Sequence, residues 1–367
     1  KPEERGIFQT ATKMVTYIVI VAESIVYAVA VYGGPSEPFV LYVIIGQLMA
    51  ASIIIMFLDE LIQKGWGLGS GISLFIMAGV AQQILWSMFS PLPAGDGGMI
   101  GIIPYLVESV IGSGDLGNVL FRSNQLPSIF GLCLTAGIIL ILVFTQGMKI
   151  EIPIVSTKYR GFQAVYPIKM MYVSNIPVIL ASALTANAVF VFQMIWSNFN
   201  PRNNNFFVNF IAQFDPTSPS TPIGGLIYYV TPPRGLDVAA LDPMRAVGYV
   251  LFMIGIVVVF GKLWVELGGL SPKSAAQNLL DADVQIPGFR RSNKPVEALL
   301  NKYIPSVTII GSCILGLLAG VSDVLGVFGS GIGILLMVDI LINYYTQLVR
   351  EQVEVVMPRL GALLGRK

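Results

Sequence analysis

The sequence has no histidine, only two cysteines and few charged residues. Without histidine, no imidazole can act as a general base or bind a metal ion. Cys133 and Cys313 each lie in an apolar run, and they provide neither a disulfide framework nor the spacing of a metal site. The chain also lacks a GxxxxGKS or GxxxxGKT phosphate-binding loop, and without histidine its Ser, Asp and Glu residues form no recognisable catalytic constellation. These absences argue against an enzyme, against a nucleotide-driven motor of that type and against a bound cofactor or metal.

Charged residues make up 12% of the chain, against about 25% in a typical soluble domain. Apolar residues make up 54%, and the mean hydropathy is +0.75. A soluble protein with so much apolar content would need a polar shell, which so few charged side chains cannot supply. We therefore expect lipid to cover much of the surface. The formal net charge of +1 gives no general attraction to nucleic acid.

Long apolar runs are abundant in the chain. A helix needs about 20 apolar residues to cross a hydrocarbon core of about 30 Å. Eight windows come close to this length or exceed it, at residues 14–33, 39–58, 71–89, 129–147, 171–196, 244–265, 305–321 and 325–345. We therefore expect an all-α polytopic membrane protein with eight transmembrane helices.

Eight spans place both chain ends on the same side of the membrane. On that side lie 18 of the 22 Lys and Arg residues, which predicts that both ends are cytosolic. Two cytosolic connectors, residues 148–170 and 266–304, are basic and long. The external connectors, residues 91–128 and 198–243, hold Gly-rich, Asn-rich and Pro-rich stretches. We expect all four to be loops of a single membrane-embedded domain over residues 1–367.

Few charged or helix-breaking residues lie inside the windows. Glu23 and Asp339 are mid-span, where a carboxylate costs about 2.5–3.5 kcal/mol on insertion scales and should face protein or water. A hydrogen bond between packed helices and the polar lining of a path both remain possible explanations. Pro177 lies within the fifth window, where it can kink a helix. Asp59 and Glu60 lie at a cytosolic helix end, where we expect them to be solvated.

The cytosolic connector before the fifth window continues into that window as YRGFQAVYPIKMMYVSNIPVILASAL. Five shorter motifs accompany it in the chain: GIFQT, DELIQKGWGLGSGISLFIMAG, PGFRRS, KYIP and GSGIGILL. In sequence and in order, these motifs resemble the SecY family of protein-translocating channels, in its archaeal and eukaryotic branch. The resemblance covers essentially the whole chain. It implies the ten-span SecY fold, with the eight windows matching spans three to ten, so we expect the first two spans and the plug segment between them to be missing.

The resemblance also implies roles for individual residues. The pore ring would include Ile72, Ile76, Ile179 and Leu336. The polar pair at the lateral gate would be Glu23 and Asn187. The cytosolic arginines that dock on a ribosome or a translocation motor would be Arg160, Arg290 and Arg291. Such an aliphatic ring expels water from a narrow waist, yet it forms no directional bonds with a passing polypeptide.

The predicted function is that of the central subunit of a protein-conducting channel, which moves unfolded polypeptides across a membrane and releases apolar segments into it. The implied partners are a SecE-type (gamma) subunit, a beta subunit, a ribosome or translocation motor, signal peptides and nascent chains, and membrane lipid. The archaeal-like motifs favour the plasma membrane of a prokaryote over the endoplasmic reticulum.

Two alternatives belong to other functional classes. A secondary transporter would use helices broken near Pro177 and in the Gly-rich run 326–337, and it would couple ions through Glu23 or Asp339. The uniformly aliphatic ring positions and the long basic connectors disfavour it. An inert membrane scaffold is the third hypothesis, which would be favoured if the purified complex conducted no polypeptide.

Overall fold

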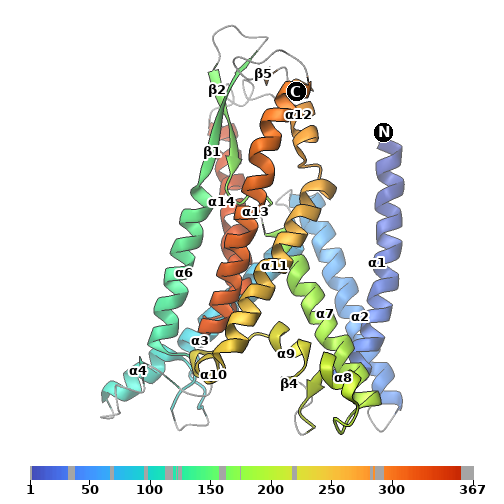
Figure 1. Ribbon diagram of the computed structural model, residues 1–367, viewed down its shortest axis with the longest axis vertical. Helices are drawn as coiled ribbons and strands as arrows, with labels where there is room; N and C mark the ends of the chain where they lie inside the picture. The colour runs from blue at the N-terminus through green and yellow to red at the C-terminus, as the bar shows by residue number, and fades with distance from the viewer. Residues whose placement is uncertain are drawn as a thin grey trace. The chain divides into compact units, whose positions relative to one another are not determined.

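The computed structural model of the chain is mostly helical (Figure 1). It describes residues 2–31, 38–66, 70–94, 98–111, 119–120, 122, 126–156, 163–173, 175–216, 221–281, 284–285 and 293–356. Among these residues, eight helices are long and apolar enough to cross a membrane, which confirms the predicted number. They are α1 (Pro2–Val31), α2 (Pro38–Leu61), α3 (Gly71–Phe89), α6 (Ile129–Gly147), α7 (Ile176–Phe199), α11 (Pro243–Leu267), α13 (Asn293–Leu325) and α14 (Gly331–Val356). The chain divides into two compact units: Lys1–Phe75 with Tyr344–Lys367, and Ile76–Asn343.

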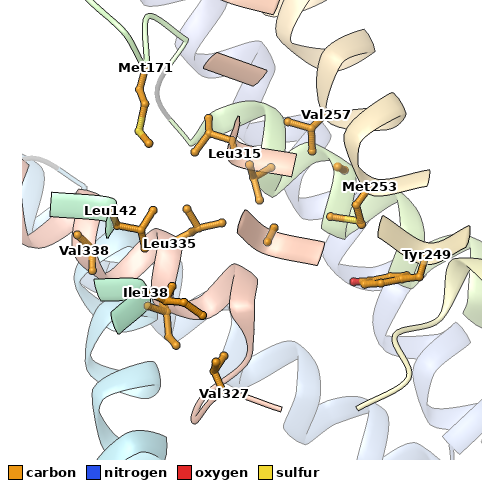
Figure 2. Close-up of a cluster of buried hydrophobic side chains, with 14 residues drawn as sticks. Ile138, Leu142, Met171, Tyr249, Met253, Val257, Leu315, Val327, Leu335 and Val338 are labelled. Atoms are coloured by element: carbon orange, nitrogen blue, oxygen red, sulfur yellow. The ribbon is translucent and has the colours of Figure 1, made fainter. Parts of the chain in front are cut away.

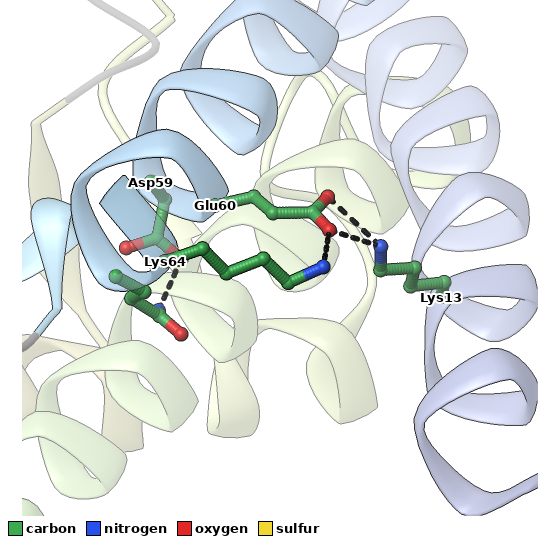
Figure 3. Close-up of polar contacts among 5 residues, drawn as sticks. Lys13, Asp59, Glu60 and Lys64 are labelled. Carbon is green, nitrogen blue, oxygen red and sulfur yellow. Dashed lines mark hydrogen bonds and ion pairs between the residues drawn. The ribbon is translucent and has the colours of Figure 1, made fainter. Parts of the chain in front are cut away.

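The first unit contains α1, α2, the single π-helical turn Ile62–Trp66 and the adjoining ends of α3 and α14. A charged cluster joins α1 to the end of α2 (Figure 3). The Nζ atom of Lys13 lies 2.8 Å from Oε1 of Glu60, and Lys64 pairs with the same carboxylate from one turn further along. The expectation that Glu60 is merely solvated is therefore wrong. Because the cluster is exposed, we expect it to contribute little to stability.

Five helices, α6, α7, α11, α13 and α14, supply the main apolar core of the second unit. Figure 2 shows this cluster, whose members include Leu142, Met253, Leu315, Leu335 and Val338. Glycines let α11 and α13 approach closely, since a Cβ atom on Gly316 would lie 2.7 Å from the Cα atom of Ile254. Packing through small residues is how membrane helices gain contact, because lipid supplies little hydrophobic drive between them.

The two predicted cytosolic connectors fold together. The chain between α6 and α7 forms a hairpin of β1 (Lys149–Ser156) and β2 (Gln163–Lys169), and β1 also pairs with β5 (Val284–Gln285), giving the order β2–β1–β5. The helix α12 (Pro272–Asp281) and the start of α13 pack against this sheet at one end of the unit (Figure 1). Their shared core includes Ile152, Ile168, Leu279, Leu300 and Ile304. These segments, which we expected to be loops, therefore hold strands, a helix and a small core of their own.

Short elements lie at the opposite end of the second unit (Figure 1). They are α4 (Ile102–Ile111), α8 (Phe206–Ile211), α9 (Leu226–Val230), α10 (Leu236–Leu241), β3 (Gln213–Phe214) and β4 (Pro222–Gly224). An asparagine network fixes the turn after α7: the indole nitrogen of Trp196 donates to Asn203, and the amide of Asn200 donates to Asn209, each at 2.7 Å. The connectors predicted to be external are therefore also ordered over their described parts.

Two helix boundaries differ from the sequence prediction. Pro177, which the sequence placed inside a span where it could kink the helix, lies in the first turn of α7, where the missing N–H costs no helical hydrogen bond. The Gly-rich run before the last helix forms a turn, in which Gly326 and Gly329 have φ values of 68° and 79°. Glycine adopts such values without a steric penalty, and α14 begins only at Gly331.

Candidate functional site

The start of α3 carries two predicted pore-ring residues, Ile72 and Ile76, one turn apart. The side chain of Asp59 fixes this start, because its Oδ1 accepts hydrogen bonds from the amide of Ile72 (3.0 Å) and the hydroxyl of Ser70 (3.2 Å). The close approach requires Gly71, since a Cβ atom there would lie 2.9 Å from the Cα atom of Asp59. A carboxylate suits a helix N-terminus, where N–H groups are free and the helix dipole is positive. Asp59 is therefore a capping residue, and the expectation that it is merely solvated is wrong.

The other two ring positions lie on α7 and α14. The side chain of Ile179 is 37% exposed and that of Ile72 is 47% exposed, whereas Leu336 is 8% exposed. Ile72 belongs to the first unit, and the other three positions belong to the second. The convergence of all four on one waist stays a prediction.

Asn175, which the sequence analysis did not single out, links α7 to α14. Its Nδ2 donates to the backbone carbonyl of Leu335 at 2.9 Å, and its side chain is 3% exposed. Its own carbonyl accepts from the amides of Val178 (3.0 Å) and Ile179 (3.1 Å) in the first turn of α7. An Asn two residues before a Pro is a recognisable helix-start signal, but the sequence gives no sign of its partner.

The predicted lateral-gate residues are Glu23 on α1 and Asn187 on α7. Both side chains are exposed. Glu23 lies in the first unit and Asn187 in the second, so their proximity stays a prediction. Mid-span polar groups need water or protein as partners, because hydrocarbon offers no hydrogen bond.

The mid-span carboxylate of Asp339 is bound by two amides. Its Oδ1 accepts from Gln146 at the end of α6 (3.1 Å), and its Oδ2 accepts from Asn343 one turn along α14 (3.2 Å). Of the two explanations that the sequence left open for Asp339, a hydrogen bond between packed helices fits this geometry.

A second carboxylate, which the sequence analysis missed, is buried near the end of α13. Asp323 is 5% exposed, and it accepts hydrogen bonds from the hydroxyl of Tyr249 (2.8 Å) and the amide of Gly331 (2.7 Å). It therefore ties α13 to α11 and to the first residue of α14. A cavity of about 410 Å³ adjoins this cluster, and its lining includes Thr185, Gln193, Arg234 and Ser330. A lone carboxylate beside a Gly-rich run was the only sequence signal for this site.

The predicted docking arginines, Arg160, Arg290 and Arg291, lie outside the described residues. Their described flanks are joined, because Val155 pairs with Gln285 at the end of β1. Arg160 follows β1 in the sequence, and Arg290 and Arg291 follow β5. Strand pairing therefore brings together the two chain segments from which these arginines continue.

A half-buried tyrosine connects this sheet to the turn between α11 and α12. Tyr172, between β2 and α7, donates its hydroxyl to the carbonyl of Leu270 at 2.9 Å. Burial raises the pKa of Tyr172 to about 12, and the neighbouring Tyr166 adds to the effect. The hydroxyl therefore stays protonated, and remains a donor, at neutral pH.

No group of three or more His, Cys, Asp or Glu side chains in the described ranges could hold a metal ion. Cys133 and Cys313 are free thiols.

A model of the SecY family matches residues 1–345. The chain belongs to the SecY family. This confirms the prediction made from the collinear motifs, and it makes the chain a multi-pass membrane protein of a family of protein-translocating channels.

Three solved structures resemble this SecY-family chain over 96% of its length. One is a SecY protein whose plug domain stabilises the closed state of the translocation channel and maintains a membrane seal (34% identity, TM-score 0.77, 76% of that chain covered). Another is a protein-conducting channel (34% identity, TM-score 0.78, 75% of that chain covered). The third is Sec61 in a canine ribosome–channel complex from the endoplasmic reticulum (32% identity, TM-score 0.75, 75% of that chain covered). The yeast Ssh1 complex bound to the 80S ribosome, at 22% identity, shares the fold.

Proposed function

We propose that this chain is the central subunit of a channel that moves unfolded polypeptides across a membrane and releases apolar segments sideways into lipid. The observation that carries the proposal is the likeness to a protein-conducting channel, with a TM-score of 0.78 over 96% of the chain. We also propose that the eight long helices correspond to spans three to ten of the ten-span fold.

The proposed pore ring consists of Ile72, Ile76, Ile179 and Leu336. The proposal is supported by the aliphatic character of all four residues and by the substantial exposure of Ile72 and Ile179. Aliphatic side chains around a narrow waist exclude water and ions at rest. They also let polypeptides of any sequence pass, because they offer no hydrogen-bonding groups that select among side chains.

The proposed partners are a SecE-type subunit, a beta subunit and a ribosome or translocation motor, with signal peptides and nascent chains as substrates. The ribosome is proposed because canine Sec61, at 32% identity, occurs in a ribosome–channel complex. The proposed docking surface is formed by the segments that carry Arg160, Arg290 and Arg291, and the pairing of β1 with β5 supports their joint use. We place both ends of the chain in the cytosol of a prokaryote and the helices in its plasma membrane.

The transporter alternative loses its main structural support. It required helices interrupted near Pro177 and in the Gly-rich run, but α7 is continuous from Ile176 and α14 is continuous from Gly331. Asp339, one of its two coupling carboxylates, accepts hydrogen bonds from Gln146 of α6 and from Asn343 of its own helix. These observations favour the channel.

The pore ring is tested by the variants Ile179→Asn and Ile72→Asn in the complete channel complex. Each should raise the resting ion conductance in a planar bilayer, because a polar group stabilises water at the waist. Leu184→Asn is a matched control, since this exposed residue lies about 140° around α7 from Ile179. Wild-type conductance in both ring variants at normal abundance would refute the ring assignment.

The docking surface is tested by charge reversal. Arg160→Glu and Arg290→Glu should weaken ribosome binding, and the loss should shrink as salt is added, because salt screens attraction between exposed arginines and phosphates. The control is Lys273→Glu, an exposed reversal on α12 in the same folded region. Equal ribosome affinity of wild type and both arginine variants at low salt would leave the basic segments as topology determinants.

The lateral gate is tested by replacing Glu23 and Asn187 with leucine together. The double variant should shift the hydrophobicity at which a test segment enters lipid, because opening the gate exposes these polar groups. An unchanged threshold at normal channel abundance would reduce both to helix-packing residues.

A further inference from the structure

Asn175 occupies a junction between α7 and α14. Its side-chain amide donates to the carbonyl of Leu335 (2.9 Å), so it holds the peptide group that joins Leu335 to Leu336. Its main-chain carbonyl accepts from the amide of Ile179 (3.1 Å). One residue thus contacts both the turn that carries Ile179 and the peptide that carries Leu336.

We propose that Asn175 is a positioning residue that fixes the spacing of the pore-ring residues Ile179 and Leu336. This inference rests on the proposed function, because it takes those two residues as members of the ring. Asn175 itself is buried, so it acts through the helices it joins and not by contact with a translocating chain.

The apolar packing around this junction does not define a spacing by itself. Val178, Ala181, Leu335 and Val338 belong to one apolar cluster. Apolar contact is non-directional, so such helices can slide or rotate by small steps with little loss of buried area. A hydrogen bond from a short amide to one particular carbonyl has a narrow range of length and angle, and it selects one register.

Burying an asparagine at position 175 lowers stability, which indicates that this side chain has a specific role. The side chain of Asn175 is 3% exposed, and no donor among the described residues reaches its Oδ1. A buried acceptor without a partner is unfavourable, and a leucine of similar size would avoid it. The side chain also makes no capping bond to α7 itself. The contact that Asn175 contributes and leucine cannot is therefore the bond to α14.

The experiment measures the α7–α14 distance and the resting leak separately, in the complete channel complex. Spin labels are attached at Leu184→Cys on α7 and Leu341→Cys on α14, both exposed, after Cys133 and Cys313 are replaced by alanine. Pulsed electron resonance then reports the distance distribution, and planar-bilayer recordings without labels report the conductance.

Two variants remove the amide. Asn175→Leu keeps the volume, whereas Asn175→Ser keeps a residue favoured at helix starts but is too short to reach α14. The control is Asn198→Leu, which removes an amide bond (2.8 Å) to the carbonyl of Met194 within α7. Loss of one hydrogen bond between membrane helices should raise the population of displaced distances about 3- to 20-fold. The control should leave the distribution unchanged.

The outcomes separate this inference from the proposed function. A broadened distribution with raised conductance in either Asn175 variant supports both. A broadened distribution at wild-type conductance supports the role of Asn175 in holding α7 and α14 in register, but it refutes the pore-ring assignment. A distribution like that of wild type in whichever variants fold overturns the inference, whatever the conductance. If neither variant folds, Asn175 is a stability residue, and the inference is equally overturned.

Discussion

Replacing Gly316 of α13 with alanine should force α13 away from α11, whereas the same replacement at Gly255 of α11 should not. The new Cβ atom at Gly316 would lie 2.7 Å from the Cα atom of Ile254 and 3.0 Å from the carbonyl oxygen of Met253. Both neighbours are backbone atoms, which cannot rotate away. At Gly255 nothing lies within 4 Å of the added atom.

The two sites differ in burial and in this contact, and both substitutions replace a glycine within a long helix. Alanine favours a helix over glycine by about 1 kcal/mol in each. At Gly316 the backbones must separate by roughly 1 Å to reach ordinary contact distance. Overpacking of this kind costs about 1–3 kcal/mol. Gly316→Ala should therefore be about 1–3 kcal/mol less stable than Gly255→Ala, a ratio of about 5 to 160 in the unfolding constant.

The assay is equilibrium unfolding of the purified complex in mixed micelles with increasing dodecyl sulfate, followed by near-ultraviolet circular dichroism. The comparison of two identical substitutions cancels most of the effect of glycine on the unfolded chain. If Gly316→Ala unfolds at the same detergent fraction as Gly255→Ala, the close contact of α11 with α13 is not a determinant of stability, and the argument from glycine contacts fails.

Two further predictions concern hydrogen-bonded carboxylates. Tyr249→Phe removes the hydroxyl that donates to buried Asp323 (2.8 Å) and should cost about 1–3 kcal/mol of unfolding free energy, whereas Tyr229→Phe, at an exposed site, should cost little in the same unfolding assay. Asp242 caps α11. A hydrogen bond from the hydroxyl of Tyr228 (2.8 Å) is the main cause that lowers the pKa of Asp242, and a hydrogen bond from the backbone amide of Arg245 adds to the effect. The cap is therefore fully present above the ordinary pKa of Asp and is lost as the pH falls through the lower, folded value. Hydrogen exchange in the first turn of α11, corrected for intrinsic rates, should be constant from pH 7 to about pH 5 and rise below about pH 4, and Asp242→Asn should abolish the rise.

The membrane spans were predictable because the signal for them is local. A transmembrane helix satisfies its backbone hydrogen bonds within its own segment, so summed hydropathy over about 20 residues is sufficient. The windows 71–89 and 129–147 coincide with α3 and α6. The window 305–321 covers only part of α13, which begins at Asn293. The first turns of α13 were missed because they are less apolar overall, although Val296, Leu300 and Ile304 pack with the sheet and α12.

Only part of the sheet β2–β1–β5 could be predicted from the sequence. Ile150, Ile152 and Ile154 alternate with other residues along β1, and such a period-two pattern predicts a strand. The pairing of β1 with β5 could not be predicted in the same way. β5 is two residues long and lies far along the chain, so its partner is selected by the packing of α12 and α13.

The sequence by itself determined the membrane class, the eight spans and, through its collinear motifs, the SecY family. Only the tertiary structure decided which polar side chains bind one another. Asn175 and Leu335 are 160 residues apart, Tyr249 and Asp323 are 74 apart, and Gln146 and Asp339 are 193 apart. Hydropathy cannot assign such partners, because it is insensitive to the rotation and depth of one helix relative to another. Close packing at small residues such as Gly316 sets that rotation and depth, and the hydrogen bonds between helices follow from it.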